Sequence, residues 1–297
     1  MGGGSWDRAS FTSYSLSKGM TVDAATGAIR GDYSSTQMYT QKHLHAELNP
    51  HKVMRECVDS LEHPGTLPVI LALDVTGSMG PAAVEVSKQL NAIMTHLYSQ
   101  VKDIEFCVMG IGDLAYDRKA PIQMSQFESD VRIAEHMDKV FFEYGGGGNA
   151  YESYTAAWYM GARHTKLDCW KRGKKGIIIT LGDERLNPYL PKSALSAVTG
   201  DSLQGDVETQ DLYTEVTAKF DVYHIDVQHR NWHDDGIDSS WRAYLDADHY
   251  KSVPLNSVKD TIVDMILNAV GDTSAPVSQE AEEATPVSLN NNGEIVW

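Results

Sequence analysis

The chain has 297 residues, of which 42% are hydrophobic, so it can bury the core of one large domain and still carry appendages. Its 25 basic and 41 acidic residues give a formal net charge of −16, which disfavours binding to nucleic acid and to anionic membrane surfaces. No apolar stretch approaches the length of a membrane span, and the amino terminus lacks the pattern of a signal peptide. The three cysteines form no even disulfide framework, so we expect reduced thiols and a cytoplasmic location.

The first 62 residues are rich in Gly, Ser, Thr, Tyr and His and show no sustained helical or alternating pattern. We therefore predict a partly ordered N-terminal arm, residues 1–62, ahead of the main domain. Within this arm the segment from Asn49 to Ser60 is predicted to hold a short helix, and the turn sequence His63-Pro64-Gly65 marks the boundary.

The main domain begins with an unbroken apolar run, Leu67–Leu73, which ends in the turn sequence Asp-Val-Thr-Gly-Ser-Met-Gly at residues 74–80. Seven apolar residues without alternation are typical of a strand that is covered on both faces, as in a parallel sheet flanked by helices. Pro81 and apolar residues at helical spacing from Val86 to Leu97 predict a helix after the turn. The turn should therefore lie at the carboxyl end of a strand, where open α/β sheets place their ligand sites.

Four further strands and a last helix are predicted along the chain, at Ile104–Ile111, Gly176–Leu181, Val222–Val227 and His249–Val253, with the helix at Ser257–Val270. Insertions are predicted near 114–140, with an edge strand at Pro121–Phe127 and a short helix at Val131–Val140, and near 187–220. This order predicts an α/β fold with a doubly wound, mostly parallel sheet flanked by helices, over residues 63–271. Residues 272–297 contain acids but no Lys or Arg, which predicts an acidic disordered tail.

Polar side chains gather at the predicted ends of three segments of this domain. They are Asp74, Thr76 and Ser78 after the first strand, Asn149 and Glu152 after the glycine run at 145–148, and Asp183 after the strand Gly176–Leu181. Hydroxyl, carboxylate and amide oxygens suit a hard cation such as Mg²⁺, Mn²⁺ or Ca²⁺, whereas zinc favours His and Cys. The three loops are therefore predicted to form a divalent-cation site.

The same loops resemble those of von Willebrand factor type A (VWA) domains that carry a metal-ion-dependent adhesion site (MIDAS). Asp-Val-Thr-Gly-Ser is similar to the family signature Asp-x-Ser/Thr-x-Ser, Gly-Gly-Gly-Gly-Asn-Ala-Tyr-Glu to its glycine-rich second loop, and Leu-Gly-Asp-Glu to the loop with the last acidic ligand. The resemblance covers about residues 66–270 and implies a Rossmann-like sheet with a divalent cation bound at one end. It also implies that Asp74, Thr76 and Ser78 are ligands from the first loop and Asp183 the acid of the third.

The second loop departs from the commonest pattern of the family, in which a Thr follows the glycines. Asn149 stands in that place, whereas Glu152 matches the acid of a subgroup that carries Asp-x-Pro-Glu, although Tyr151 replaces its proline. The resemblance therefore favours Glu152 over Asn149 as the direct ligand. The choice affects charge, because Asp74 and Asp183 alone neutralise a divalent cation, while a third carboxylate leaves the site at −1 and weakens its attraction for an acidic partner.

The function that this resemblance implies is protein binding rather than catalysis, with an Asp or Glu of a partner protein completing the coordination sphere of Mg²⁺. The chain is also similar, more loosely, to stand-alone intracellular bacterial or phage members of the family, which implies an adaptor or scaffold for a MoxR-type AAA+ ATPase. Two alternatives stay open. One is a metal-assisted hydrolase that uses the same carboxylates, with Asp113 or Glu184 as the additional acid. The other is a structural subunit of a phage or bacterial assembly.

Overall fold

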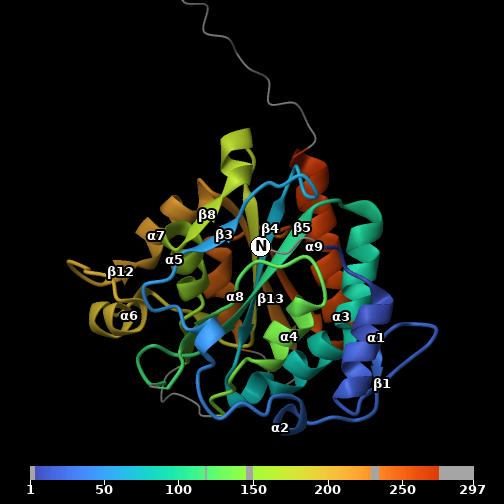
Figure 1. The fold of residues 1–297 in the computed structure, drawn as a ribbon. Helices are drawn as coiled ribbons and strands as arrows, with labels where there is room; N and C mark the ends of the chain where they lie inside the picture. Colours follow the sequence, from blue (N-terminus) through green and yellow to red (C-terminus); the bar gives the residue numbers. More distant parts are fainter. Residues whose placement is uncertain (1–3, 118, 145–149, 229–233, 274–297) are drawn as a thin grey trace, which may run out of the picture.

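The structure is a computed structural model that describes residues 4–117, 119–144, 150–228 and 234–273. At its centre lies a six-stranded sheet with the strand order β14-β13-β9-β4-β5-β6 (Figure 1). Its strands are β4 (Leu67–Asp74), β5 (Ile104–Ile111), β6 (Ile122–Met124), β9 (Gly176–Gly182), β13 (Phe220–Gln228) and β14 (Tyr250–Pro254). Neighbouring strands run parallel, except for the antiparallel pair of β5 and β6. The prediction of an α/β fold with a doubly wound, mostly parallel sheet is confirmed.

Helices cover both faces of this sheet, which explains why its central strands are apolar without alternation. Along β4, Val69, Leu71 and Leu73 belong to the hydrophobic cluster of one face, and Ile70 and Ala72 to that of the other. The first face is covered by α3 (Gly80–Gln100), α4 (Arg132–Asp138), α9 (Val258–Thr273) and α1 (Arg8–Ser17). The second is covered by α5 (Thr155–Arg163), α7 (Thr209–Thr217) and α8 (Asp235–Arg242) (Figure 1).

The strand order reverses direction beside β4. From β4 the chain passes through α3 to β5 on one side, whereas β9 pairs with β4 on the other. The helices that follow β4 and β9 thus lie on opposite faces, so the carboxyl ends of these two strands are the topological switch point of the sheet, where open α/β sheets place ligands. Asp74 is the last residue of β4 and lies next to Ile111 of β5, while Gly182 ends β9. The sheet therefore brings the first and third predicted loops to one place, which we call the carboxyl edge.

Both predicted insertions contain secondary structure. In the first, the edge strand is β6 and the short helix is α4, as predicted. In the second, α6 (Lys192–Thr199) connects the antiparallel strands β11 (Tyr189–Leu190) and β12 (Val207–Glu208), and α7 follows. The predicted last strand and last helix correspond to β14 and α9. Apart from the last two residues of α9, the predicted tail lies outside the described residues.

The prediction of a helix between Asn49 and Ser60 is wrong. None of these residues, all of which the structure describes, is helical, and their regular element is the strand β3 (Arg55–Cys57). β3 pairs in parallel with β8 (Thr165–Leu167), and the Arg55 amide donates to the His164 carbonyl at 2.8 Å. The partner strand lies more than a hundred residues away along the chain, so the local sequence gives no sign of it.

The arm also contains a helix, α1, in a stretch without a helical pattern. Asp7 caps it by accepting a hydrogen bond from the Ser10 amide at 2.8 Å, and Phe11 is its main buried side chain. The Trp6 indole donates to Asn91 of α3 at 2.9 Å, and the Asn91 amide donates to the Gly27 carbonyl at 3.0 Å, so a buried side chain of α3 fastens two parts of the arm. The other arm elements are β1 (Thr21–Val22), β2 (Ile29–Arg30), α2 (Ser35–Met38) and η1 (Ala46–Leu48).

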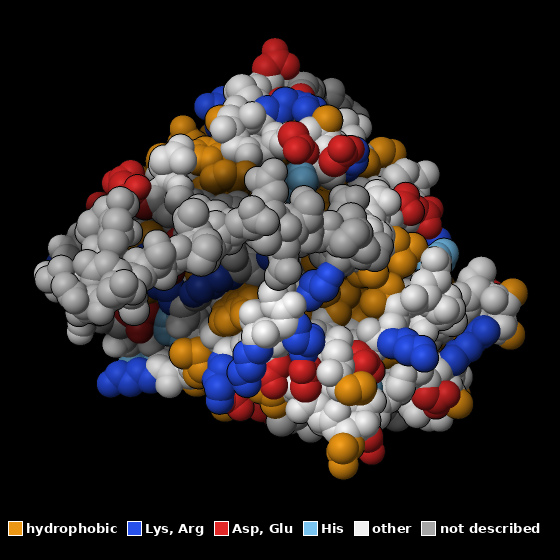
Figure 2. All heavy atoms as spheres, turned by 90° about the horizontal axis from the view of Figure 1, so that it is seen from above, with side chains coloured by type: hydrophobic (Ala, Val, Ile, Leu, Met, Phe, Trp, Pro, Cys, Tyr) orange, Lys and Arg blue, Asp and Glu red, His pale blue; other side chains and the backbone are white. Residues whose placement is uncertain are grey.

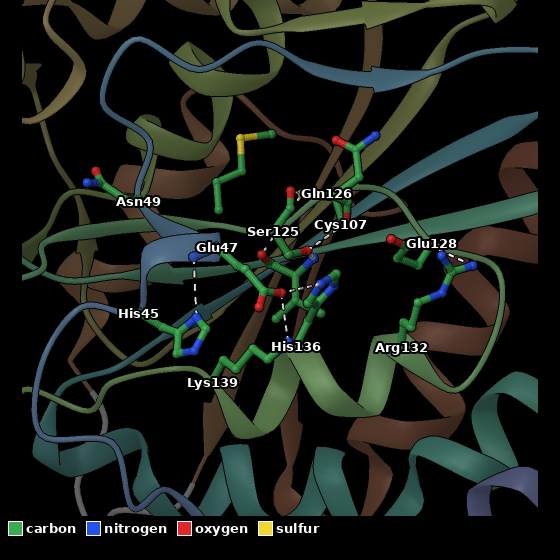
Figure 3. Close-up of polar contacts among 12 residues, drawn as sticks. His45, Glu47, Asn49, Cys107, Ser125, Gln126, Glu128, Arg132, His136 and Lys139 are labelled. Atoms are coloured by element: carbon green, nitrogen blue, oxygen red, sulfur yellow. Dashed lines mark hydrogen bonds and ion pairs between the residues drawn. The ribbon is translucent and has the colours of Figure 1, made fainter. Parts of the chain in front are cut away.

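A polar contact ties η1 to α4 (Figure 3). Glu47 Oε2 lies 2.7 Å from Lys139 Nζ and 3.8 Å from His136 Nε2. Burial lowers the pKa of His136 to about 4, with the Lys139 charge acting in the same direction. His136 is therefore neutral at pH 7, and Lys139 is the cation that pairs with Glu47.

The face of the molecule at the amino ends of the parallel strands lies opposite the carboxyl edge. Figure 2 views the molecule from this side, and Lys and Arg side chains lie there among acidic ones. Lys171 Nζ lies 2.6 Å from Asp168 Oδ1, and Lys175 Nζ lies 3.2 Å from Asp221 Oδ1.

The three cysteines are free and buried, as expected for reduced thiols. In the part of the chain that the structure describes, no helix is both long and apolar enough to cross a bilayer.

Candidate metal centre

The first loop of the carboxyl edge is built around Asp74. Its Oδ1 atom accepts hydrogen bonds from the Thr76 amide at 2.8 Å and from the Thr76 hydroxyl at 2.6 Å, so the side chain closes a tight turn directly after β4. Thr76 precedes the 3₁₀ turn η2 (Gly77–Met79), which leads into α3. Asp74 and Thr76 are both buried. The strand end and the helix start therefore hold the carboxylate and the hydroxyl in a fixed relation.

Ser78 links this loop to the third. Its Oγ atom donates to Asp183 Oδ1 at 3.1 Å and lies 3.4 Å from Thr76 Oγ1. A hydroxyl has one proton and two lone pairs, so when Thr76 and Ser78 donate to the two carboxylates their lone pairs stay available to a cation. Four of the predicted site residues thus form two hydrogen-bonded pairs, Asp74 with Thr76 and Asp183 with Ser78, whose hydroxyl oxygens lie 3.4 Å apart; we call them the linked group.

Glu152 of the second loop lies beside the third loop. It belongs to the short strand β7 (Tyr151–Glu152), which pairs in parallel with β10 (Arg185–Leu186), two residues beyond Asp183. Its side chain is buried, and Oε2 makes no hydrogen bond with any described residue. Asn149, the other candidate of this loop, lies outside the described residues.

Burial makes the charges of these carboxylates costly. It raises the pKa of Asp74, with Asp183 adding to the effect and the hydrogen bonds from Thr76 opposing it. Burial also raises the pKa of Glu152 far above its ordinary range, and Asp74, Asp113 and Asp117 contribute in the same direction. A cation among these oxygens would stabilise their ionised forms and give the unpaired Glu152 oxygen a partner.

The donor set fits a hard divalent cation better than zinc. The hydrogen-bonded residues supply the oxygens of two hydroxyls, Thr76 and Ser78, and of two carboxylates, Asp74 and Asp183, the ligand chemistry that Mg²⁺ and Mn²⁺ accept, without His or Cys. Within the described residues, no group of three or more His, Cys, Asp or Glu side chains is arranged to hold a metal. The group at the carboxyl edge contains two acids, Asp74 and Asp183, so the structure does not arrange Glu152 with them as a third acid around a metal.

Tyr154 is a residue of this edge that sequence reasoning missed. Its hydroxyl donates to Asp74 Oδ2 at 2.8 Å and accepts from the amides of Asp183 and Glu184 at 3.2 and 3.3 Å. Burial, together with the charge of Asp74, raises the pKa of Tyr154 well above its ordinary value, so the hydroxyl keeps its proton. The only signal in the sequence is a Tyr two residues after Glu152, which does not predict a contact with the first loop.

The two further acids considered for a hydrolase lie near the same edge. Asp113 follows β5 and is buried; its Oδ1 accepts from the Ala115 amide at 2.7 Å, while Oδ2 has no hydrogen-bond partner among the residues described. The backbone of Glu184 is held on both sides, by Tyr154 at its amide and by the Trp241 indole at its carbonyl, 3.2 Å away. These contacts define positions but do not assign a catalytic role.

Comparisons with known proteins assign no family to the chain. No family model matches it, and no curated protein is similar to it. Among solved structures it is similar to two crystal structures of the pilus adhesin SpaC from Lactobacillus rhamnosus GG, one of them in an open conformation. Each shows 13% sequence identity and a TM-score of 0.48 over 74% of this chain. The chain spans about a third of the length of the adhesin, with 31% and 32% of the adhesin chains covered.

Proposed function

We propose that the chain is a VWA-type domain that binds a protein partner through a divalent cation, Mg²⁺ or Mn²⁺, at the carboxyl edge of its sheet. The observation that carries the proposal is the linked group of Asp74, Thr76, Ser78 and Asp183, in which the hydroxyls donate hydrogen bonds to the carboxylates and keep their lone pairs for the metal. Glu152, whose buried Oε2 has no hydrogen-bond partner among the residues that the structure describes, is the ligand expected from the second loop.

An Asp or Glu of the partner would complete the coordination sphere, because hard cations prefer carboxylate oxygens. The cation would attract this acid at the surface of a chain that carries a formal charge of −16. Release of Glu152 from the metal would remove one negative charge from the coordination sphere and strengthen the attraction for the partner. The site could thus alternate between a closed state with Glu152 bound and an open state with the partner bound.

The proposed cellular location and class of partner rest on the motif resemblance alone. It favours an adaptor in the cytoplasm of a bacterium or of a phage-infected cell, with a MoxR-type AAA+ ATPase as the class of partner. The free, buried thiols support a reducing compartment. A structural subunit of an assembly is the alternative within the same class of non-enzymatic proteins.

The test is partner capture with and without the metal. Tagged protein is incubated with lysate in Mg²⁺ or in EDTA, and retained proteins are identified and quantified by mass spectrometry for the wild type and for Asp74→Ala. The matched control is Asp248→Ala, which removes an exposed carboxylate before β14 at the other end of the sheet. The proposal expects a protein that is retained in Mg²⁺ by the wild type and the control, and lost in EDTA or with Asp74→Ala. Capture that neither treatment changes contradicts it, and Mg²⁺-dependent turnover of a phosphoester by the purified protein would favour the hydrolase.

A further inference from the structure

Tyr154 contacts all three loops of the candidate metal centre. Its hydroxyl joins Asp74 of the first loop to the amides of Asp183 and Glu184 in the third, and its own amide donates to the Glu152 carbonyl at 2.9 Å. A phenol oxygen has one proton to donate and two lone pairs to accept with, so these three contacts use its full hydrogen-bonding capacity. One side chain therefore fixes the spacing between the two carboxylates that carry the site.

The tyrosine is held rigidly in turn. Its side chain is fully buried, and Tyr154 is the residue that caps α5. Its ring packs against Trp241, with centroids 5.4 Å apart, and against His224 at 5.2 Å. The Trp241 indole also donates to the Glu184 carbonyl, so the third loop is held by the tyrosine on one side and by α8 on the other. A residue held in this way positions its hydrogen-bond partners without rearrangement.

Gly182 gives this hydroxyl its access to the two strand ends. A Cβ atom at residue 182 would lie 2.0 Å from the Tyr154 oxygen and 2.3 Å from the ring carbon Cζ, far inside any allowed contact. The lack of a side chain at the last residue of β9 lets the phenol pass over the backbone and reach Asp74. The close packing of Tyr154 against Gly182 thus joins β4 to β9.

From these contacts we infer that Tyr154 is the positioning residue of the metal centre: it does not bind the cation, but it sets the distance between the first and third loops at which the cation fits. The inference rests on the proposed function. With both oxygens of Asp74 engaged by protein donors, Thr76 on one and Tyr154 on the other, the carboxylate is fixed in orientation before any metal arrives. Loss of the phenol hydroxyl would free one oxygen of Asp74 and two amides of the third loop together.

The experiment is a titration of the purified, full-length protein with Mn²⁺, with free and bound ion followed by electron paramagnetic resonance. Tyr154→Phe removes the hydroxyl and keeps the ring. The expected result is a Mn²⁺ affinity about 10- to 100-fold weaker than that of the wild type, as for other groups that orient metal ligands, with an altered spectrum of the bound ion. The spectrum is the readout that a general loss of stability would leave unchanged.

The matched control is Tyr98→Phe, which removes a hydroxyl bonded to the Ile104 and Ser129 carbonyls near the other end of the sheet. It should lower the urea midpoint of unfolding but leave Mn²⁺ affinity and spectrum unchanged. Wild-type affinity and spectrum in Tyr154→Phe would overturn the inference while leaving the proposed function intact, and equal loss in both variants would overturn it in favour of a purely structural role. Absence of saturable Mn²⁺ binding by the wild type would overturn the proposed function and the inference with it.

Discussion

A single methyl group added to Gly182 should damage the carboxyl edge more than its size suggests. In Gly182→Ala the new Cβ atom would lie 2.0 Å from the Tyr154 oxygen and 2.3 and 2.4 Å from its ring carbons Cζ and Cε1. Ordinary contacts of a Cβ atom begin near 3.4 Å, so the ring has to move by more than an ångström. Trp241 and His224 are themselves fully buried against that ring, so its displacement disturbs them as well.

The expected cost has two parts. Forcing an extra methyl group into a packed core costs about 1–3 kcal/mol of the free energy of unfolding. A displaced Tyr154 hydroxyl leaves the buried Asp74 oxygen and the amides of the third loop unpaired, which costs about 1–3 kcal/mol more. The substitution should therefore lower the free energy of unfolding by about 4 kcal/mol.

Urea unfolding followed by tryptophan fluorescence measures this loss. The control is Gly205→Ala, because a Cβ atom at that position meets nothing within 4 Å, and it should change the free energy of unfolding by less than about 0.5 kcal/mol. A Gly182→Ala protein with a stability within about 1 kcal/mol of the wild type would refute the account of how β4 and β9 are joined.

Three further changes test other parts of the structure. Because the pKa of His136 falls from 6.5 to about 4 on folding, the unfolded chain takes up its proton first, and the free energy of unfolding should drop by about 3 kcal/mol between pH 7 and pH 4. Urea unfolding across that range measures this drop, and His136→Gln should make the free energy of unfolding depend less on pH. The same pH dependence in the wild type and in His136→Gln would refute the assignment of the drop to His136. Asn91→Ala leaves the Trp6 indole and the Gly27 carbonyl unpaired, so it should cost about 3 kcal/mol and speed limited proteolysis of the arm, and a cost below about 0.5 kcal/mol would contradict the fastening role. Glu152→Gln keeps the shape of the side chain but removes its charge, and Mg²⁺ affinity measured by calorimetry should fall about tenfold or more; unchanged affinity would exclude Glu152 as a ligand.

The sheet could be predicted from the sequence because its strands are buried on both faces. β5 matches the predicted run Ile104–Ile111 at both ends, and β4 and β9 differ from their predicted runs by a single residue. Each apolar run ends at polar residues, and in a parallel sheet the carboxyl ends of neighbouring strands lie at the same edge. The meeting of Asp74 and Asp183 therefore followed from two local patterns and one rule of topology.

Contacts made by long-range packing could not be predicted in this way. The role of Tyr154 depends on the missing side chain of Gly182, which is 28 positions away, and neither residue has a local pattern that points to the other. β3 is a strand only because β8 pairs with it, so a propensity-based prediction of helix failed there. In the case of α1, the apolar residues are too few to reveal a face, and the Asp7 cap is the main local sign of a helix.

The most direct test of the central claim is whether the carboxyl edge binds a divalent cation. Mn²⁺ titration of the wild type should show one saturable site per chain, and Ser78→Ala, which deletes a single hydroxyl of the linked group, should abolish it. Ser99→Ala, which deletes an exposed hydroxyl at the far end of α3, should bind as the wild type does. A wild type without saturable binding, or a Ser78→Ala variant that binds Mn²⁺ as tightly as the wild type, would contradict the account.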